Sequence, residues 1–499
     1  MKRTSGILLS ISSLPSEYGI GTFGKAAYRF ADFLKEAGQH CWQMLPLGST
    51  SYGDSPYQSF STFAGNPYFI DPELLMEDGL LTKAEAGMYD WGSDPRRVDY
   101  EKIYNSRFDM LLIAKKRGWE RDGAAVAAFA AENASWLPEY ALYMAAKRHF
   151  GMKAWTEWPD EDLKLHREAA CEKYRALLKE DIELFTYIQY LFFRQWNDLR
   201  NYIHANDISI MGDLPIYVAL DSADVWSEPR YFMLDEKGEP QDVSGVPPDY
   251  FSKDGQLWGN PLYDWDEMKK DGYGWWIRRI DGASKLYDRI RIDHFRGFDE
   301  YWAVPYGETT ARNGAWKKGP GMDLVGVLGS WFPGIRFVAE DLGFQTPGVQ
   351  KLLCESGWPG MKVLEFAFNN YDSADHLPHT YSRNCICYTG THDNAPVGEW
   401  REDADEGVIR YAEEYLGVEN KEDDREFTRR LIRAGMGSVA DTFFAPMQDW
   451  LGLGKGSRMN TPGIPAGNWQ WRMLPGEDSA ELAAGIRELT ELFGRCERR

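Results

Sequence analysis

The sequence predicts an α/β fold, a (β/α)8 TIM barrel with a helical insertion and long loop insertions around one rim. Two observations carry this prediction. Short apolar runs typical of buried strands alternate with segments of helical periodicity, as in a parallel sheet covered by helices. Several of these runs end in a carboxylate, and right-handed crossovers bring the carboxyl ends of parallel strands to one rim. The carboxylates in question are Asp213, Asp293, Glu340 and Asp393.

The expected strands are short apolar runs bounded by turn residues. The first unit is a strand at 6–9, a helix at 25–37 with apolar residues at helical spacing, and a second strand at 41–45 that Pro46 ends. The same strand pattern recurs at 208–213, 289–293, 335–339, 361–368 and 385–389, and we expect a weak eighth strand near Arg458. Helical patterns occupy 275–287, 349–357, 405–416, 425–442 and 480–492.

Insertions are expected within one catalytic barrel domain that spans 1–499. Residues 72–165 have helical patterns without strand alternation and predict a helical subdomain. The segment 217–270 is loop-like from 222 to 265, rich in Pro, Gly and aromatics, and too long to be a mere connection, so we expect it to cover the site. A small irregular insertion is expected at 300–330. The polar and aromatic stretch 51–61 fits either a binding loop or a surface Ω-loop.

Composition narrows the class of function. The chain has 499 residues, and 43% of them are hydrophobic, which is enough for a large core. A net charge of −21 argues against nucleic acid or an anionic membrane as a partner. The 20 Trp, 27 Tyr and 25 Phe offer flat apolar faces that suit sugar rings, although most of them are expected in the core.

Cysteine usage and the N-terminus predict a cytoplasmic protein. The six cysteines form no CxxC pair, and we interpret them as buried thiols in a reducing compartment. The apolar run at 7–9 is too short for a signal peptide or a membrane span. We expect a monomer or a homodimer.

The segment from Arg289 to Phe298 is the most informative stretch. Side chains two apart on a strand share a face, so Arg291 and Asp293 point the same way at a strand end. One such pair is more often an ordinary ion pair than an active site. The repetition of strand-end carboxylates along the chain favours a catalytic rim instead.

Carboxylates that meet in an aromatic cleft indicate glycosidic bond chemistry, which needs a nucleophile or base and a carboxylic acid. We expect Arg291 to keep Asp293 ionised and nucleophilic, and desolvation to keep a proton on Glu340. His294 and His392 could bind a metal with the carboxylates, but metal-ligand spacing is absent and we expect no metal. Phosphate-binding glycine loops and a GxSxG motif are also absent from the sequence.

At this point the sequence resembles the 4-α-glucanotransferases, the amylomaltase or disproportionating-enzyme family. The matching motifs follow one another in family order, and together they are highly specific. They are residues 53–59 (GDSPYQS), 212–218 (GDLPIYV), 247–251 (PPDYF), 255–261 (GQLWGNP), 291–297 (RIDHFRG), 339–343 (AEDLG), 391–394 (THDN) and 460–463 (NTPG). The resemblance is to a compact form of the family, without a separate C-terminal sheet domain.

The resemblance implies a role for each matched residue. Asp293 is the implied nucleophile, Glu340 the general acid/base, and Asp393 the carboxylate that holds sugar hydroxyls and stabilises the transition state. Substrate contacts are implied for Tyr57, Asp213, Arg291, His294, His392 and Asn460, and for Asp249, Tyr250, Phe251, Gln256 and Trp258 in the covering loop. For some of these a structural reading stays open: Asp213 as a strand-end cap, Trp258 as core packing, His392 as a residue that orders its loop.

The implied reaction moves a segment of an α-1,4-glucan to the 4-hydroxyl of another glucan or of glucose, with retention and without a cofactor. The implied partners are α-1,4-glucans such as maltooligosaccharides, amylose, starch or glycogen chains. Two alternatives remain at this point. One is an α-glucan hydrolase of the amylase type, and the other is a non-catalytic glucan-binding protein on the same barrel.

Overall fold

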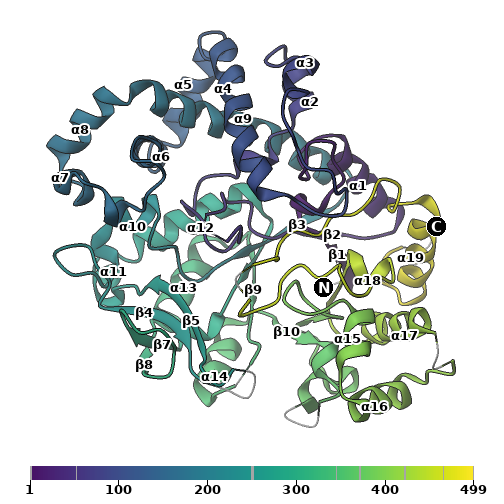
Figure 1. The fold of residues 1–499 in the computed structure, drawn as a ribbon. Coiled ribbons are helices and arrows are strands. Elements are labelled where there is room, and N and C mark those ends of the chain that lie inside the picture. The colour runs from purple at the N-terminus through teal and green to yellow at the C-terminus, as the bar shows by residue number, and fades with distance from the viewer. Residues whose placement is uncertain are drawn as a thin grey trace.

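The computed structural model describes residues 3–51, 53–248, 252–343, 345–369, 373–420, 423–464 and 466–497. Its centre is an eight-stranded parallel sheet with the order β10-β11-β12-β1-β2-β3-β6-β9 (Figure 1). The edge strands β9 and β10 close the sheet into a barrel, because the Ala339 N–H donates to the Pro359 carbonyl at 3.0 Å. The strands are β1 (Thr4–Leu8), β2 (Cys41–Gln43), β3 (Ser209–Leu214), β6 (Arg289–Ile292), β9 (Arg336–Ala339), β10 (Gly360–Val363), β11 (Cys385–Tyr388) and β12 (Thr442–Pro446). The predicted barrel is confirmed.

The eighth strand lies elsewhere than predicted. It is β12, which pairs with β1 and β11, whereas Arg458 lies in an irregular segment. The helix predicted at 425–442 is too long at its C-terminal end and reaches the first residue of this strand. In the structure α17 (Asp424–Gly437) ends five residues before the strand begins at Thr442. All five residues of β12 are buried, and a short buried run without alternation does not reveal its own type of structure.

Helices surround the barrel and present one apolar face to it. In α1 the buried residues are Ala27, Phe30, Ala31, Phe33 and Leu34, a stripe with helical spacing. The covering helices are α1 (Lys25–Glu36), α9 (Lys179–Ala205), α12 (Gly274–Leu286), α13 (Met322–Trp331), α14 (Pro347–Ser356), α15 (Val397–Asp403), α16 (Glu406–Leu416), α17, α18 (Met447–Trp450) and α19 (Ala480–Leu492). No helix in the described ranges is both long and apolar enough to span a lipid bilayer.

A group of helices between β2 and β3 stands apart from the barrel, at the top of Figure 1. It consists of α2 (Pro72–Glu77), α3 (Lys83–Ala86), α4 (Tyr100–Gly118), α5 (Gly123–Glu132), α6 (Leu137–His149), α7 (Glu161–Lys164) and α8 (Glu168–Leu177). The buried Lys147 joins α6 to the segment after β3, because its Nζ contacts Asp221 Oδ2 at 2.5 Å. The Tyr143 hydroxyl donates to Asp221 Oδ1, also at 2.5 Å, so this carboxylate anchors the helical group.

A four-stranded antiparallel sheet with the order β5-β4-β7-β8 lies beside the barrel (Figure 1, lower left). Its strands are β4 (Asp242–Val246), β5 (Gln256–Pro261), β7 (Glu300–Pro305) and β8 (Ala315–Lys318). The predictions of loop-like structure at 222–265 and irregular structure at 300–330 are wrong where these strands form. Gly245 pairs with Trp302, and pairing between segments so far apart leaves no local signal. Two short helices, α10 (Ala223–Ser227) and α11 (Trp265–Lys270), flank the sheet strands.

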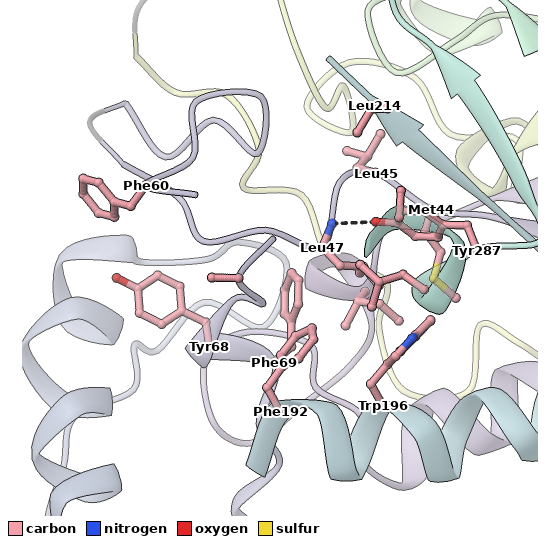
Figure 2. Close-up of a cluster of buried hydrophobic side chains, with 14 of the residues drawn as sticks. Met44, Leu45, Leu47, Phe60, Tyr68, Phe69, Phe192, Trp196, Leu214 and Tyr287 are labelled. Atoms are coloured by element: carbon pink, nitrogen blue, oxygen red, sulfur yellow. Dashed lines mark hydrogen bonds between the residues drawn. The ribbon is translucent and has the colours of Figure 1, made fainter. Parts of the chain in front are cut away.

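A cluster of buried hydrophobic side chains surrounds the chain where it leaves β2 (Figure 2). It includes Phe69, Phe192, Trp196 and Tyr287. The Leu47 N–H donates to the Tyr287 hydroxyl at 3.0 Å, which ties this segment to the end of α12. A Cβ at Gly212 would lie 2.3 Å from the Tyr287 ring, so β3 can approach α12 only with glycine at this position. The cluster thereby fixes the end of β3, where Asp213 lies.

The six cysteines are free thiols. Five are buried, as predicted, but Cys354 is exposed on α14, and the prediction of six buried thiols is wrong for that residue.

Candidate active site

The strand register brings three carboxylates to one rim. Asp213 of β3 pairs with Arg291 of β6, and Ile292 of β6 pairs with Ala339 of β9. Asp293 and Glu340 therefore follow two paired residues on adjacent strands, which lie about 4.8 Å apart. The Glu340 N–H donates to the Ile292 carbonyl at 3.0 Å, so the ladder continues as far as Glu340.

Arg291 braces two of these carboxylates from within the barrel. Its Nη1 donates to Asp213 Oδ1 at 2.7 Å and Oδ2 at 2.5 Å, and lies 3.0 Å from Asp293 Oδ1. Asp213 also accepts the Tyr57 hydroxyl at 2.6 Å. Asp213 and Arg291 are almost fully buried, whereas the Asp293 side chain keeps 30% of its surface exposed. Asp293 is thus the member of this cluster that remains open to a ligand.

Backbone amides hold the Glu340 carboxyl. Oε2 accepts the His294 N–H and Oε1 accepts the Leu342 N–H, each at 2.8 Å. His294 adopts the left-handed conformation, with φ 53° and ψ 49°, which is uncommon for a residue other than glycine and clusters at functional sites. This turn directs the chain after Asp293 toward Glu340.

Asp393 comes from the loop after β11 and is held by the irregular segment before α19. Asn460 Nδ2 donates to Asp393 Oδ1 at 2.6 Å, and His392 Nε2 lies 3.3 Å from Oδ2. Arg458 Nη2 donates to the Asp393 carbonyl at 2.7 Å and Nε to the Asn460 carbonyl, also at 2.7 Å. The structure thus places Asn460, a predicted substrate contact, against Asp393, and Arg458 is a supporting residue that the sequence reasoning missed.

Three rings join this loop to the Tyr57 loop. Tyr57 and His392 stack with centroids 5.2 Å apart and planes at 19°. Trp469 packs against both, at 5.7 Å from Tyr57 and 5.9 Å from His392. Burial lowers the pKa of His392, so its ring is neutral at neutral pH. Trp469 was not among the predicted site residues, although it lies in the polar and aromatic stretch 468–472.

The antiparallel sheet brings two predicted residues to the rim. Trp258 of β5 packs edge-on against His294 with centroids 4.8 Å apart, and its Nε1 donates to Gln256 Oε1 at 3.2 Å. Burial lowers the pKa of His294 to about 4, so this ring is also neutral at neutral pH. The predicted contacts of Asp249, Tyr250 and Phe251 lie outside the described residues.

Burial and four neighbouring charged groups together set the pKa of Asp293. Burial raises the pKa of the Asp293 carboxyl well above its usual range; Arg291 opposes this rise, and Asp213, Glu340 and Asp393 add to it. Arg291 therefore acts in the expected direction, against burial, and its role in keeping Asp293 ionised stays a prediction. Burial also raises the pKa of Glu340, against Arg291 and the two amide donors, as expected for an acid.

Within the described residues, no group of three or more His, Cys, Asp or Glu side chains is arranged to hold a metal ion. The absence of a cofactor from the reaction stays a prediction from the resemblance.

Paired carboxylates on adjacent strand ends of a (β/α)8 barrel place this chain in the class of enzymes that act on glycosidic bonds. Comparison with known proteins narrows the class. The family model described as 4-alpha-glucanotransferase matches residues 9–477, and the chain belongs to this family.

Named relatives and a solved structure are similar to this chain along nearly its whole length. A 4-alpha-glucanotransferase from Clostridium butyricum is 46% identical over 491 residues, which cover 98% of this chain and 100% of that protein. One from Thermus thermophilus is 45% identical over 504 residues and 99% of both chains. The structure of an amylomaltase from Streptococcus agalactiae in complex with acarbose superposes with a TM-score of 0.96, at 41% identity, over 99% of this chain and 100% of that chain. These similarities favour a transferase over an amylase-type hydrolase.

Proposed function

We propose that the protein transfers a segment of an α-1,4-glucan to the 4-hydroxyl of a second glucan or of glucose by double displacement. Asp293 is the nucleophile, and Glu340 is the general acid and base. The single observation that supports this most strongly is the register of β6 and β9, because it sets the two carboxylates at the same level of adjacent strands. A retaining mechanism needs the two carboxyl groups roughly 5–5.5 Å apart.

In the first displacement, Glu340 gives its proton to the glycosidic oxygen while an Asp293 oxygen attacks the anomeric carbon. The bond to the leaving glucan breaks, and a β-linked glycosyl ester forms on Asp293. The raised pKa of Glu340 suits the acid role. The positive charge that develops at the anomeric carbon favours the ionised form of Asp293, which Arg291 Nη1 supports from 3.0 Å away.

In the second displacement, the 4-hydroxyl of the acceptor attacks the anomeric carbon and Glu340 takes its proton. The ester breaks, Asp293 leaves as a carboxylate, and a new α-1,4 bond forms. Two inversions give net retention. One α-1,4 bond replaces another, so the reaction needs no nucleotide or metal to supply energy.

The donor sugar is held by the remaining polar groups of the rim. Asp393 receives sugar hydroxyls and stabilises the transition state, with its oxygens oriented by Asn460 and His392. Asp213 and Tyr57 line the same subsite, since their mutual hydrogen bond fixes both beside Arg291. Because these groups are fixed before substrate binds, little reorganisation is needed in the transition state.

Transfer requires that a sugar, and not water, reaches the glycosyl ester. The resemblance implies this task for residues 249–251. We assign it also to the segment of β5 with Gln256 and Trp258, which packs on His294 next to Glu340. An aromatic surface there binds the flat face of an acceptor sugar and keeps out water. Maltooligosaccharides, amylose, starch and glycogen chains are the proposed substrates. The cytoplasmic location and the monomeric or homodimeric state stay predictions from the sequence.

A time course with maltotriose tests the proposal. Transfer produces glucose together with longer maltooligosaccharides at a constant total of reducing ends, whereas hydrolysis raises that total. The variants Asp293→Asn and Glu340→Gln are each expected to lower kcat by roughly a hundredfold or more. Reducing ends that rise in step with glucose, or an Asp293→Asn variant with wild-type turnover, would contradict the proposal.

A further inference from the structure

Arg291 has a contact that the proposed reaction does not use. Its Nη1 serves the two carboxylates, but its Nε donates to the sulfur of Met361 at 3.3 Å. Met361 lies on β10 and is buried, with 1% of its surface exposed. β10 is not the neighbour of β6 in the sheet, because β9 lies between them. The contact therefore crosses the barrel interior.

Met361 is itself held in place from the catalytic rim. Its N–H donates to Asp341 Oδ1 at 2.7 Å, and Asp341 directly follows Glu340 in sequence. Asp341 is buried as well. One chain of contacts thus leads from the residue after the proposed acid, through Met361, to the arginine beside the proposed nucleophile.

The geometry of a guanidinium explains why the sulfur matters. Its five N–H donors lie in one rigid plane, so a partner at Nε fixes the direction of Nη1. Nη1 must reach Asp213 and Asp293 at once, which only a narrow range of orientations allows. A thioether is a weak but polarisable acceptor, and at a buried site its loss removes the partner of a charged donor.

We propose that Met361 is a positioning residue for the transfer reaction, and that its sulfur orients Arg291 toward Asp293. The inference rests on the proposed role of Asp293 as nucleophile. The ordinary alternative is that Met361 only fills space in the barrel interior, as a buried methionine commonly does. Met211 offers a comparison within the same protein, because it packs in the same buried cluster.

Three variants separate the two readings. Met361→Leu keeps the volume and removes the acceptor, and Met361→Gln restores an acceptor at the expense of apolar packing. If the sulfur orients Arg291, kcat on maltotriose falls by about fivefold to tenfold in Met361→Leu and recovers in part in Met361→Gln. KM changes by less than about threefold, since Met361 does not touch substrate. Met211→Leu, the matched control, keeps wild-type kcat.

Each contrary outcome has a distinct meaning. Wild-type kcat in Met361→Leu, or a lower kcat in Met361→Gln than in Met361→Leu at temperatures where both are folded, would overturn the inference and leave Met361 as packing. An equal loss in Met211→Leu would do the same. Asp293→Asn is assayed in parallel: activity retained there would reject the proposed function itself, whereas its loss together with an unaffected Met361→Leu rejects only the inference.

Discussion

The position of the Asp293 carboxyl lowers the stability of the ligand-free protein when this group is ionised. Burial raises its pKa well above the usual range, so this carboxyl favours the folded state only while it is protonated. That contribution is complete below the unfolded pKa of about 4 and is lost as pH rises through the folded value. Ionisation of Asp293 therefore lowers the free energy of unfolding, a loss of stability of the kind that active sites retain for activity.

We predict that Asp293→Asn raises the Tm by about 1–3 °C at about pH 8, because the amide needs no ionisation. The gain shrinks toward zero as pH falls below about 4, where the wild-type carboxyl is protonated in both states. Differential scanning calorimetry across this pH range is the measurement. Asp109→Asn, at an exposed position on α4, is the control with no such trend. A Tm below wild type at about pH 8 would mean that Arg291 outweighs burial.

The removal of one hydroxyl group, that of Tyr57, tests the proposed donor subsite. Tyr57→Phe removes the 2.6 Å hydrogen bond to Asp213 and keeps the ring that stacks on His392. Because Asp213 keeps Arg291 as a partner, we expect Tm to change little and kcat/KM for maltotriose to fall by about tenfold. Steady-state kinetics and a thermal melt on the same preparation measure both. An unchanged kcat/KM would remove Tyr57 from the site.

The closure of the barrel between β9 and β10 depends on a glycine. A Cβ at Gly360 would lie 2.5 Å from Asp341 Oδ2, and this carboxylate is fixed by the Met361 N–H. Gly360→Ala is therefore expected to destabilise the fold by roughly 1–3 kcal/mol and to lower kcat, because Asp341 adjoins Glu340.

Gly329 on α13 is the control for Gly360, because a substitution there is expected to have the opposite effect on stability in a thermal melt. It is exposed and helical, and a Cβ there meets nothing within 4 Å. Gly329→Ala should stabilise by about 0.5–1 kcal/mol through helix propensity, with unchanged kcat. Equal effects of the two substitutions would refute the steric account of Gly360.

The strands and helices that could be predicted from the sequence are those with a local pattern of their own. Seven barrel strands were predicted because each is a short apolar run followed by a turn, and Asp213, Asp293, Glu340 and Asp393 were found because each follows such a run. β12 was missed because it has no alternation, and the antiparallel sheet because its pairings join distant segments. Arg458 and Trp469 are linked to the site only by contacts with Asp393 and His392, which no local pattern predicts.

The whole molecule is closed by contacts between the two ends of the chain. Arg495 is fully buried and donates from Nη1 to the Thr4 carbonyl at 2.7 Å and from Nε to the Met436 carbonyl at 2.9 Å. Burial and the neighbouring Arg3 lower the pKa of Arg495 to about 10, so it stays charged at neutral pH. Its hydrogen bonds tie the start of β1 to the end of α17.

We predict that Arg495→Met lowers the Tm by about 5 °C or more, because buried carbonyls lose a charged donor. The kcat at temperatures below the transition should stay near wild type, since the site lies at the opposite ends of the strands. Arg429→Met, at an exposed position on α17, is the control with an unchanged Tm. A small effect at Arg495 would show that the barrel closes without this contact.

In the proposed reaction Asp293 becomes covalently glycosylated, and the glycosylated enzyme can be trapped and detected. In Glu340→Gln, α-maltosyl fluoride can still glycosylate Asp293, because fluoride leaves without an acid, whereas attack by the acceptor is slow without a base. Trypsin cuts after Arg291 and Arg296, so Asp293 is the one carboxylate side chain in peptide 292–296. Mass spectrometry should find a maltosyl group on that peptide. A maltosyl group on a different peptide, or rapid turnover of the fluoride with no adduct, would show that Asp293 is not the nucleophile.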